Sequence, residues 1–400
     1  MNAVVHPGLL RGGVRVPPSK SVAHRMLIAA ALADAPTEIE LSALNEDILA
    51  TIGCLRALGA RIEQAENGLR VQPLEASRCA ESTLNCGESG STLRFMLPVA
   101  AALGVACTFV GAGRLPERPN RILTDALNAH GVCADRELLP IRLSGRLRGG
   151  TYAVAGNVSS QYVTGLLLAL PLCAEESEIV LTKPLESASY VGITLETLRA
   201  FGVRVQETPM GWRVAGGQRY VSPGRVQVEG DWSAAAFWLA ANALGSRVEC
   251  EGLNAASAQG DRAIVRMLNG LGSEIDVSDT PDLVPALAVA AAMHPGRTCI
   301  TGAARLRVKE SDRLRAVADM LHALGGQVEE RSDGLIIDGG RALTGGTVNG
   351  VNDHRIVMAA AVAATAAQGD VIITDAQAVA KSYPSFFEEL RRMGGRCEVG

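Results

Sequence analysis

Apolar residues along the chain recur in two kinds of helical segment. The first kind is apolar around almost its whole circumference, as in AHRMLIAAALA, SAAAFWLAANALG and HRIVMAAAVAATAA, and a short strand-like stretch such as DVIITD follows it. That pattern is typical of helices buried on all sides. The second kind is amphipathic and ends in glycine before another short strand, as in LRALGARIE and LRRMGGRCE.

The glycine-terminated segments form an internal repeat. Their glycines are Gly59, Gly131, Gly202, Gly272, Gly325 and Gly394, at spacings of 72, 71, 70, 53 and 69 residues. We expect each glycine to adopt a left-handed conformation, which a side chain would penalise. The two kinds of segment alternate, so each repeat predicts a buried helix, a strand, an outer helix, a glycine and a strand. Solenoid repeats are usually shorter, at about 20–50 residues.

The repeats predict an α/β protein of two domains, with three repeats in each, helices inside and sheets outside. The length of 400 residues fits two or three domains at about 150 residues each. The fourth repeat begins at Gly230, so we predict one domain at 18–228 and a discontinuous one at 1–17 plus 229–400. The segment before Pro17 lacks its own repeat, and we expect it to add a strand to the second domain. Two chain crossings would then form a hinge beside a cleft.

Composition and charge exclude several classes of protein. The net charge is −4 and aromatic residues make up 4% of the chain, which does not suit a protein that coats nucleic acid. The longest apolar runs, at 95–107 and 356–367, are shorter than the roughly 18 residues that span a bilayer. The nine cysteines form no C-x-x-C pair, and the N-terminus lacks the apolar run of a signal peptide. We expect a cytoplasmic protein with reduced thiols and neither nucleic-acid nor membrane partners.

Lysine is rare among the cations. The chain has 38 lysines and arginines, of which only Lys20, Lys183, Lys309 and Lys381 are lysine. A GC-rich genome that replaces lysine with arginine would leave lysine where an ammonium group is required. Lysine can lose its proton and can therefore take part in proton transfer. Arginine cannot, because it stays charged at any working pH.

Cations cluster where helices are expected to begin. The segments before the buried helices are rich in Ser, Thr, Asp, Asn and Gly, namely PSKSVAHR, CGESGSTLR, GNVSSQ, EGDWSAAA, TPDLVP and VNDHR. Capping explains those residue types. It does not explain the cations Lys20, Arg25, Arg94 and Arg355, because a helix N-terminus disfavours positive charge. Helix N-termini and arginine side chains bind phosphate and carboxylate groups, so the sequence predicts an anion site.

More cations precede the outer helices: Arg118, Arg121, Lys309, Arg313 and Lys381. Lys309 and Arg313 are four residues apart and share a helix face if this stretch is helical, with Glu310 beside them. A solvated series of ion pairs explains that stretch as well as an anion site does.

The motifs PPSKSVAHR, CGESGSTLR, LPERP, SSQY, RVKESDR, NDHR and AKSYPSFFEEL occur in this order along the chain. In these motifs the sequence resembles the 5-enolpyruvylshikimate-3-phosphate (EPSP) synthase family over essentially its whole length. The resemblance implies a two-domain inside-out α/β barrel that opens and closes, with the active site in the interdomain cleft. It implies transfer of the enolpyruvyl group of phosphoenolpyruvate to the 5-hydroxyl of shikimate 3-phosphate, with release of phosphate. We expect a monomer without cofactor or metal.

The resemblance also assigns residue roles. Shikimate 3-phosphate would be bound by Lys20, Ser21, Arg25, Ser159, Ser160, Gln161, Ser187, Tyr190, Asp282 and Lys309. Phosphoenolpyruvate would be bound by Lys20, Gly90, Arg118, Arg313, Arg355 and Lys381. The reaction protonates a methylene carbon and removes a hydroxyl proton, so it needs groups that exchange protons. Asp282, Glu310 and Lys20 are the candidates, and which carboxylate serves which proton stays open.

Three positions depart from the family pattern, and three other functions would need residues or motifs that differ from those in the sequence. The departures are Glu88, Arg305 and Gly192, and we expect Glu88 to pair with an arginine such as Arg118. A UDP-N-acetylglucosamine enolpyruvyl transferase would need a loop cysteine, and residues 111–120 contain none. An RNA 3′-phosphate cyclase would need a catalytic histidine, for which only His24 and His354 stand in motifs. A non-enzymatic anion-binding scaffold would not need the acid/base residues that are present.

Overall fold

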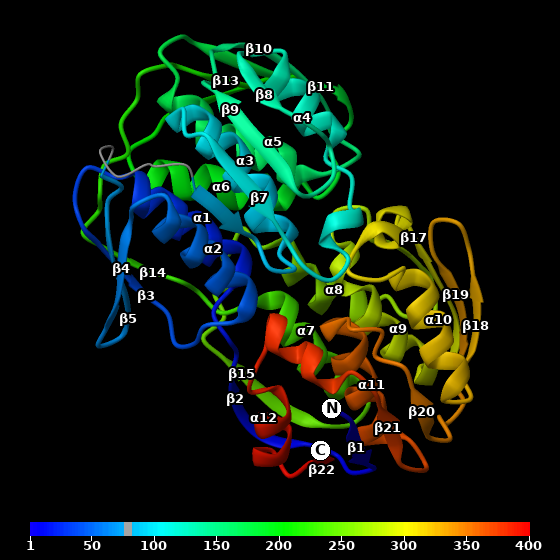
Figure 1. Ribbon diagram of the computed structural model, residues 1–400. Coiled ribbons are helices and arrows are strands. Elements are labelled where there is room, and N and C mark those ends of the chain that lie inside the picture. Colours follow the sequence, from blue (N-terminus) through cyan, green and yellow to red (C-terminus); the bar gives the residue numbers. More distant parts are fainter. Residues whose placement is uncertain (76–81) are drawn as a thin grey trace. The chain divides into compact units, whose positions relative to one another are not determined.

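The computed structural model describes residues 1–75 and 82–400. The chain divides into two compact units (Figure 1). Unit 1 consists of Met1–Pro17 and Gly230–Gly400, and unit 2 is Pro18–Glu229. Within the described residues, no helix is both long enough and apolar enough to cross a membrane.

Unit 2 alternates helices and strands. Its helices are α1 (Lys20–Leu32), α2 (Glu46–Ala57), α3 (Gly90–Leu103), α4 (Arg121–Asn128), α5 (Ser160–Ala169) and α6 (Ala188–Ala200), with 3₁₀ helices η2 (Leu115–Glu117) and η3 (Leu170–Leu172). Its strands are β3 (Thr37–Glu40), β4 (Arg61–Ala65), β5 (Gly68–Gln72), β6 (Ser82–Asn85), β7 (Cys107–Val110), β8 (Val132–Ala134), β9 (Ile141–Gly145), β10 (Gly150–Ala155), β11 (Ser177–Lys183), β12 (Val205–Thr208), β13 (Gly211–Val214) and β14 (Arg225–Gln227).

Unit 1 is assembled from both ends of the chain. Its helices are α7 (Trp232–Ala243), α8 (Ile264–Leu268), α9 (Val284–Met293), α10 (Arg313–Ala323), α11 (His354–Ala366) and α12 (Phe386–Arg392), with 3₁₀ helices η4 (Gly260–Ala263), η5 (Pro281–Leu283), η6 (Ala304–Val308) and η7 (Ala376–Lys381). Its strands are β1 (Ala3–His6), β2 (Arg11–Arg15), β15 (Arg247–Glu251), β16 (Glu274–Asp276), β17 (Gly296–Thr301), β18 (Gln327–Glu330), β19 (Leu335–Gly339), β20 (Gly346–Val348), β21 (Val371–Ile373) and β22 (Arg396–Val399).

The sheets repeat one topology. Unit 2 contains the orders β6-β7-β9-β8, β10-β11-β13-β12 and β14-β3-β5-β4, and unit 1 contains β16-β17-β19-β18 and β20-β21-β1-β22. In each of these sheets the first two strands are parallel. The remaining neighbours are antiparallel. The α/β class and the repeats predicted from the sequence are confirmed.

One repeat is shortened. The strands β2 and β15 form a two-stranded parallel sheet. The strand after Gly272, β16, pairs in parallel with β17 in the next sheet instead of forming an antiparallel hairpin. The loss of that hairpin explains why the spacing from Gly272 to Gly325 is 53 residues rather than about 70.

The N-terminal segment completes unit 1, as expected. Strand β1 lies between β21 and β22, and β2 pairs with β15. The two ends of the chain meet, since Asn2 N donates to Gly400 O at 2.7 Å and Gly400 N donates to Asn2 O at 3.0 Å. The labels N and C lie close together in Figure 1.

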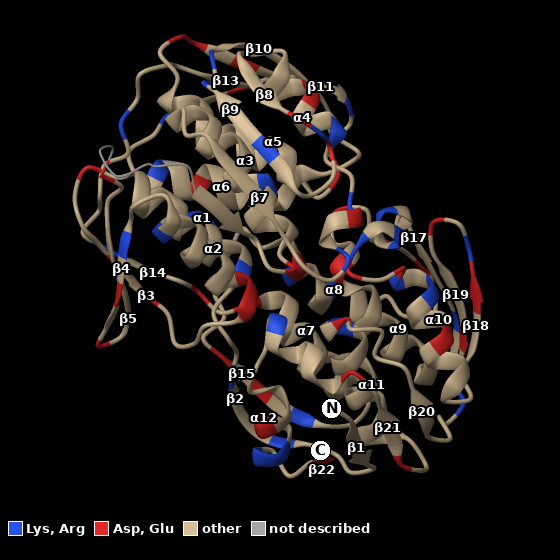
Figure 2. Cartoon of the chain, in the orientation of Figure 1, with Lys and Arg blue, Asp and Glu red and all other residues tan. Residues whose placement is uncertain are grey.

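The core consists of the helices predicted to be buried. Helices α5, α7 and α9 carry no Lys, Arg, Asp or Glu, and α9 is tan in Figure 2. Every residue of α9 from Val284 to Ala292 is buried. The six repeat glycines all have φ between 76° and 100°, which confirms the left-handed conformation predicted for them.

Candidate active site

In unit 2, a lysine opens helix α1 and pairs with helix α2. Lys20 is the first residue of α1, and its Nζ lies 2.8 Å from Asp47 Oδ2 in the first turn of α2. The side chain of Ser19 does not cap α1. The ammonium group therefore lies at a helix N-terminus where Asp47 offsets its charge.

Arg25 lies one turn further along α1 and is buried. Its Nε donates to Thr194 Oγ1 at 2.8 Å, and its other nitrogens donate to Ser21 O, Thr164 Oγ1 and Tyr190 O. All four acceptors are neutral oxygens. Burial lowers the pKa of Arg25 to about 9, so the guanidinium still carries its charge at neutral pH. An anion bound here would compensate that charge.

Helices α3 and α5 are linked at their N-terminal ends. Ser159 caps α5 by accepting from Gln161 N at 3.3 Å, and Ser160 is the first helical residue. The Gln161 side chain donates to Ser91 Oγ at 2.9 Å and accepts from Arg94 at 2.6 Å. Gln161, which the resemblance assigns to shikimate 3-phosphate, is thus already oriented by α3.

Ser187 and Tyr190 lie at the start of α6. Ser187 is buried and has a left-handed φ of 55° at the N-cap position. Tyr190 supplies its carbonyl oxygen to Arg25 at 3.0 Å. This contact links the start of α6 to α1.

Arg118 covers Gly90. A β-carbon on Gly90 would lie 2.8 Å from one terminal nitrogen of Arg118 and 3.0 Å from Cζ. Arg118 is buried, and its Nε has no hydrogen-bond partner within residues 1–75 and 82–400. The close approach needs a glycine at position 90.

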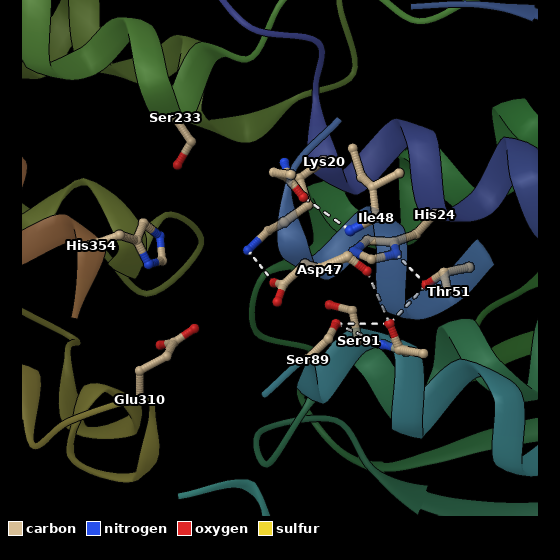
Figure 3. Close-up of polar contacts among 12 residues, drawn as sticks. Lys20, His24, Asp47, Ile48, Thr51, Ser89, Ser91, Ser233, Glu310 and His354 are labelled. Atoms are coloured by element: carbon tan, nitrogen blue, oxygen red, sulfur yellow. Dashed lines mark hydrogen bonds and ion pairs between the residues drawn. The ribbon is translucent and has the colours of Figure 1, made fainter. Parts of the chain in front are cut away.

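A chain of hydroxyl groups connects the N-terminal halves of α1, α2 and α3 (Figure 3). His24 Nδ1 lies 2.7 Å from Thr51 Oγ1, and Thr51 Oγ1 lies 2.7 Å from Thr92 Oγ1. Thr92 donates its hydroxyl proton to Ser89 Oγ at 2.8 Å. Since a hydroxyl has one proton, Thr51 donates to Thr92 and His24 donates to Thr51.

His24 remains neutral in this chain. Burial lowers its pKa well below the ordinary value, and the charges of Lys20 and Arg25 act in the same direction. Neutral His24 donates from Nδ1 to Thr51, and this sets the direction in which the hydroxyl groups of the chain donate their protons. It does not lie at an open position where it could exchange protons with a ligand, since it is 1% exposed.

In unit 1, Asp282 is the centre of a cationic cluster. Its carboxylate accepts from Arg313 at 2.8 Å and from Arg355 at 3.2 Å, and Lys309 Nζ lies 3.6 Å away. Burial alone would raise the pKa of Asp282. The three cations, led by Arg355, outweigh burial and hold that pKa well below its ordinary value. The carboxyl group is therefore ionised at neutral pH.

Arg313 is surrounded by carboxylates. It donates to Asp282 at 2.8 Å, to Glu310 at 2.5 Å and to Asp353 at 2.9 Å, and it is 1% exposed. Burial alone would lower the pKa of Arg313. The carboxylates, led by Asp353, raise it above its ordinary value. A substrate anion can reach this guanidinium only where one of these carboxylates gives way.

The predicted shared helix face of Lys309 and Arg313 is wrong. Helix η6 ends at Val308, Lys309 has extended backbone, and α10 begins only at Arg313. Both side chains nevertheless contact Asp282, although Lys309 lies outside the helix. A solvated series of ion pairs along a helix does not describe this cluster, because Arg313 and Asp353 are fully buried.

Lys381 and Arg355 complete the predicted set. Lys381 ends η7, and its Nζ donates to Asn352 O at 2.6 Å. Arg355 lies in the first turn of α11, where it donates to Ser233 Oγ at 2.6 Å. Asp353 caps this helix by accepting from Arg355 N at 3.0 Å.

The three residues that depart from the family pattern have distinct environments. Glu88 lies against Gly113, where a β-carbon would be 2.4 Å from the carboxyl group, and its pairing with Arg118 stays a prediction. Arg305 donates to Ser278 O at 2.7 Å. Gly192 lies in α6 with open space where a β-carbon would be.

Sequence reasoning missed four acidic or hydroxyl groups. Asp47 pairs with Lys20, Asp353 anchors Arg313, and Ser233 and Asp261 lie beside Arg355. The available signal was their position, because each stands at or near a helix start. Acidic and hydroxyl residues there are also ordinary caps, so position alone could not separate the two roles. The described residues include no group of three or more His, Cys, Asp or Glu that could hold a metal ion.

Comparison with known proteins gives one consistent result. The family model described as EPSP synthase (3-phosphoshikimate 1-carboxyvinyltransferase) matches residues 4–390. A 3-phosphoshikimate 1-carboxyvinyltransferase from Clostridium kluyveri is 42% identical, with 98% of this chain and 97% of the relative covered. One from Clostridium perfringens is 37% identical, with 98% of each chain covered.

Solved structures agree with the sequence relatives. The EPSP synthase of Acinetobacter baumannii matches with a TM-score of 0.83 and 27% identity, covering 100% of this chain and 99% of that chain. An enolpyruvyl transferase from Streptomyces tendae matches with a TM-score of 0.77 over 99% and 98% of the two chains. At 20% identity, the latter shows the fold alone.

Proposed function

We propose roles for individual residues on the premise that the chain belongs to the EPSP synthase (3-phosphoshikimate 1-carboxyvinyltransferase) family. It is a transferase. It moves the enolpyruvyl group of phosphoenolpyruvate to the 5-hydroxyl of shikimate 3-phosphate and releases phosphate. This reaction belongs to the shikimate pathway of aromatic biosynthesis.

The observation that carries the residue roles is the arrangement of cations around Asp282. Three cations, Lys309, Arg313 and Arg355, surround one ionised carboxylate in unit 1. The two substrates bring two phosphates and two carboxylates, whose mutual repulsion must be offset before the hydroxyl can approach the enol carbon. Lys309 and Arg355, which face the Asp282 carboxylate, contribute to that compensation, whereas Arg313 is already offset by three carboxylates.

Shikimate 3-phosphate is assigned to polar groups at helix starts and to Asp282. The assigned residues are Lys20, Ser21, Arg25, Ser159, Ser160, Gln161, Ser187, Tyr190, Asp282 and Lys309. Arg25 supports this assignment because its buried charge contacts only neutral oxygens in its four hydrogen bonds. Ser159 and Ser160 lie at the N-terminus of α5, where free backbone N–H groups suit a phosphate.

Phosphoenolpyruvate is assigned to Lys20, Gly90, Arg118, Arg313, Arg355 and Lys381. Arg118 lies over Gly90 with a buried nitrogen available, which suits a bidentate contact. Arg313 is hydrogen-bonded to three carboxylates. Direct contact between Arg313 and the substrate therefore requires Glu310 or Asp282 to move aside.

Different side chains carry out the transfer of the hydroxyl proton and the transfer of the methylene proton. Asp282 is ionised at neutral pH and so can accept the proton of the 5-hydroxyl, and substrate anions that bind its neighbouring cations would raise its pKa and make it a stronger base. Glu310 and Lys20 remain as groups that deliver a proton to the methylene carbon and remove it again during elimination. The methyl proton gained in addition is lost again in elimination, and the hydroxyl proton held by Asp282 leaves with the released phosphate, so both steps balance.

We also propose the organisation around these residues. The chain acts as a cytoplasmic monomer whose active site lies in a cleft between domains at 18–228 and at 1–17 plus 229–400. Neither a cofactor nor a metal is required, because side chains and helix ends supply the charges that the reaction needs.

A phosphate-release assay tests the function. Purified protein should release phosphate from phosphoenolpyruvate only when shikimate 3-phosphate is also present. Asp282→Asn, which keeps the shape of the side chain but removes its charge, should lower turnover at least a hundredfold. Absence of release by the unaltered protein across pH 6–9 would contradict the proposal. Equal release without shikimate 3-phosphate would contradict it as well.

A further inference from the structure

Ser233 connects Arg355 to a second carboxylate. It lies in the first turn of α7 (Figure 3), and its Oγ is 2.6 Å from a terminal nitrogen of Arg355. A guanidinium group only donates hydrogen bonds, so Ser233 accepts here. Ser233 keeps its own proton for another acceptor.

Asp261 is the neighbouring acid. Its carboxyl group is almost completely buried in η4, at 4% exposed, and the Ser233 hydroxyl lowers its pKa. Arg355 donates to Ser233, which leaves the Ser233 proton available to Asp261. Neither Ser233 nor Asp261 belongs to the residues assigned above to substrates or to proton transfer.

We propose that Ser233 and Asp261 are positioning residues. They hold the plane of the Arg355 guanidinium in the orientation that it needs to bind phosphoenolpyruvate. This inference rests on the proposed role of Arg355 in binding that substrate. Arg355 is held at both ends, since one terminal nitrogen contacts Ser233 and the other contacts Asp282 at 3.2 Å. Two anchored ends leave the planar group little freedom to rotate, and bidentate contact with a carboxylate or phosphate depends on that plane.

The surroundings of Asp261 make this anchor sensitive to pH. Burial and the neighbouring Asp282 carboxylate raise the pKa of Asp261 to about 6, and Asp231 contributes in the same direction. The charge of Arg355 and the hydrogen bond from Ser233 oppose that rise. Asp261 therefore changes charge between neutral and mildly acidic pH. Once protonated it is a weaker acceptor for Ser233, so Arg355 is held less firmly.

Steady-state kinetics of three variants test the positioning role. Ser233→Ala removes the link, and we expect the KM for phosphoenolpyruvate to rise at least fivefold while kcat and the KM for shikimate 3-phosphate change less than twofold. Ser233→Thr keeps the hydroxyl and should restore the KM for phosphoenolpyruvate to within twofold of the unaltered protein. Arg355→Lys serves as the reference for loss of the guanidinium itself.

The outcomes separate this inference from the proposed function. If Arg355→Lys leaves the KM for phosphoenolpyruvate unchanged, the assignment of Arg355 to that substrate fails. If Arg355→Lys raises that KM and Ser233→Ala does not, only the positioning role is overturned. A fall in kcat or a parallel rise of both KM values in Ser233→Ala would also overturn it, because a general structural defect acts in that way.

A pH profile of Asp261→Asn tests the charge of the anchor. Asparagine resembles protonated aspartate, so the ratio of the KM for phosphoenolpyruvate in this variant to that in the unaltered protein should be near one at pH 5.5 and at least threefold at pH 8. Substrate phosphate also titrates at about pH 6, but it affects both proteins equally. A ratio that does not change with pH would overturn the dependence on Asp261.

Discussion

Two buried arginines differ in their hydrogen-bond acceptors, and this difference indicates which of them can still bind an anion. Arg25 donates to four neutral oxygens, and its pKa falls. Arg313 donates to three carboxylates, and its pKa rises. An incoming phosphate would therefore gain more from the first guanidinium than from the second. Identical side chains thus act differently, one as a binding group and the other as the core of a charge cluster.

Gly90→Ala should weaken phosphoenolpyruvate binding without weakening the fold. The new methyl group would lie 2.8 Å from the end of the Arg118 side chain, which can move aside because it is the far end of a flexible chain. We expect the KM for phosphoenolpyruvate to rise about tenfold, equivalent to about 1.4 kcal/mol, with an unchanged midpoint of thermal unfolding.

Gly53→Ala provides the matched control. Gly53 lies in α2 of the same unit with open space around it. Alanine at that position should leave both KM values unchanged. Equal KM values for Gly90→Ala and the unaltered protein would show that Arg118 does not bind this substrate.

At the scale of single elements, the hydroxyl chain in unit 2 joins three helices through side chains. Thr51 of α2 lies between His24 of α1 and Thr92 of α3, at 2.7 Å from each. Helices that meet in this way have their N-terminal halves held relative to one another, and these halves include Lys20 and Gly90. The chain is therefore a structural support for both proposed ligand groups.

Thr51→Val should destabilise unit 2. Valine has the shape of threonine but lacks the hydroxyl, so it leaves buried polar groups on His24 and Thr92 without their partner. We expect the free energy of unfolding to fall by about 1–3 kcal/mol, measured by urea denaturation. Thr51→Ser keeps the hydroxyl and should retain the hydrogen bonds while losing only a methyl group. A larger loss for Ser than for Val would contradict the proposed importance of the hydroxyl chain.

Much of the fold follows from the sequence pattern, and the departure from it has a physical reason. The alternation of wholly apolar and amphipathic helices predicted the buried helices, and glycine at six helix ends predicted the left-handed turns. The two-stranded sheet of β2 and β15 was not predicted, because strand pairing depends on which neighbour is present and not on the strand's own residues. The 53-residue spacing was the one visible sign of it.

The cations of the site could be predicted from the sequence, but the carboxylates that pair with them could not. Lys20, Arg25 and Arg355 were identified because positive charge is unexpected at a helix start. Asp353, by contrast, is 40 residues away from Arg313 along the chain and occupies an ordinary capping position. Only the folded chain shows that this cap also neutralises a buried arginine.

At the scale of the whole molecule, unit 1 should lose stability in acid. The pKa of Asp282 and that of Asp353 are held below their ordinary values, and both residues lie in unit 1. A carboxyl group with a depressed pKa stabilises the fold above its unfolded value of about 3.9, and this contribution is lost as pH falls through the folded pKa. Unit 1 should therefore lose stability below about pH 4.

Tryptophan fluorescence can follow the two units separately. Trp212 lies in unit 2, whereas Trp232 and Trp238 lie in unit 1. In a Trp212→Phe variant the signal reports unit 1 alone, and its urea midpoint should fall between pH 5 and pH 3. Addition of Asp353→Asn should make that fall smaller, since one of the titrating groups is gone. An undiminished fall would show that the acid response comes from elsewhere.

The meeting of the two chain ends in one sheet has a consequence for how the protein is made. Strand β1 is synthesised first, yet its partners β21 and β22 begin only at Val371 and Arg396. Unit 2 is complete once Glu229 has left the ribosome and can fold while synthesis continues. Strand β1 must wait for β22, so unit 1 can be finished only after Val399 has been synthesised. A chain truncated by even its last five residues would lose β22 and leave β1 with an open edge during every attempt to fold.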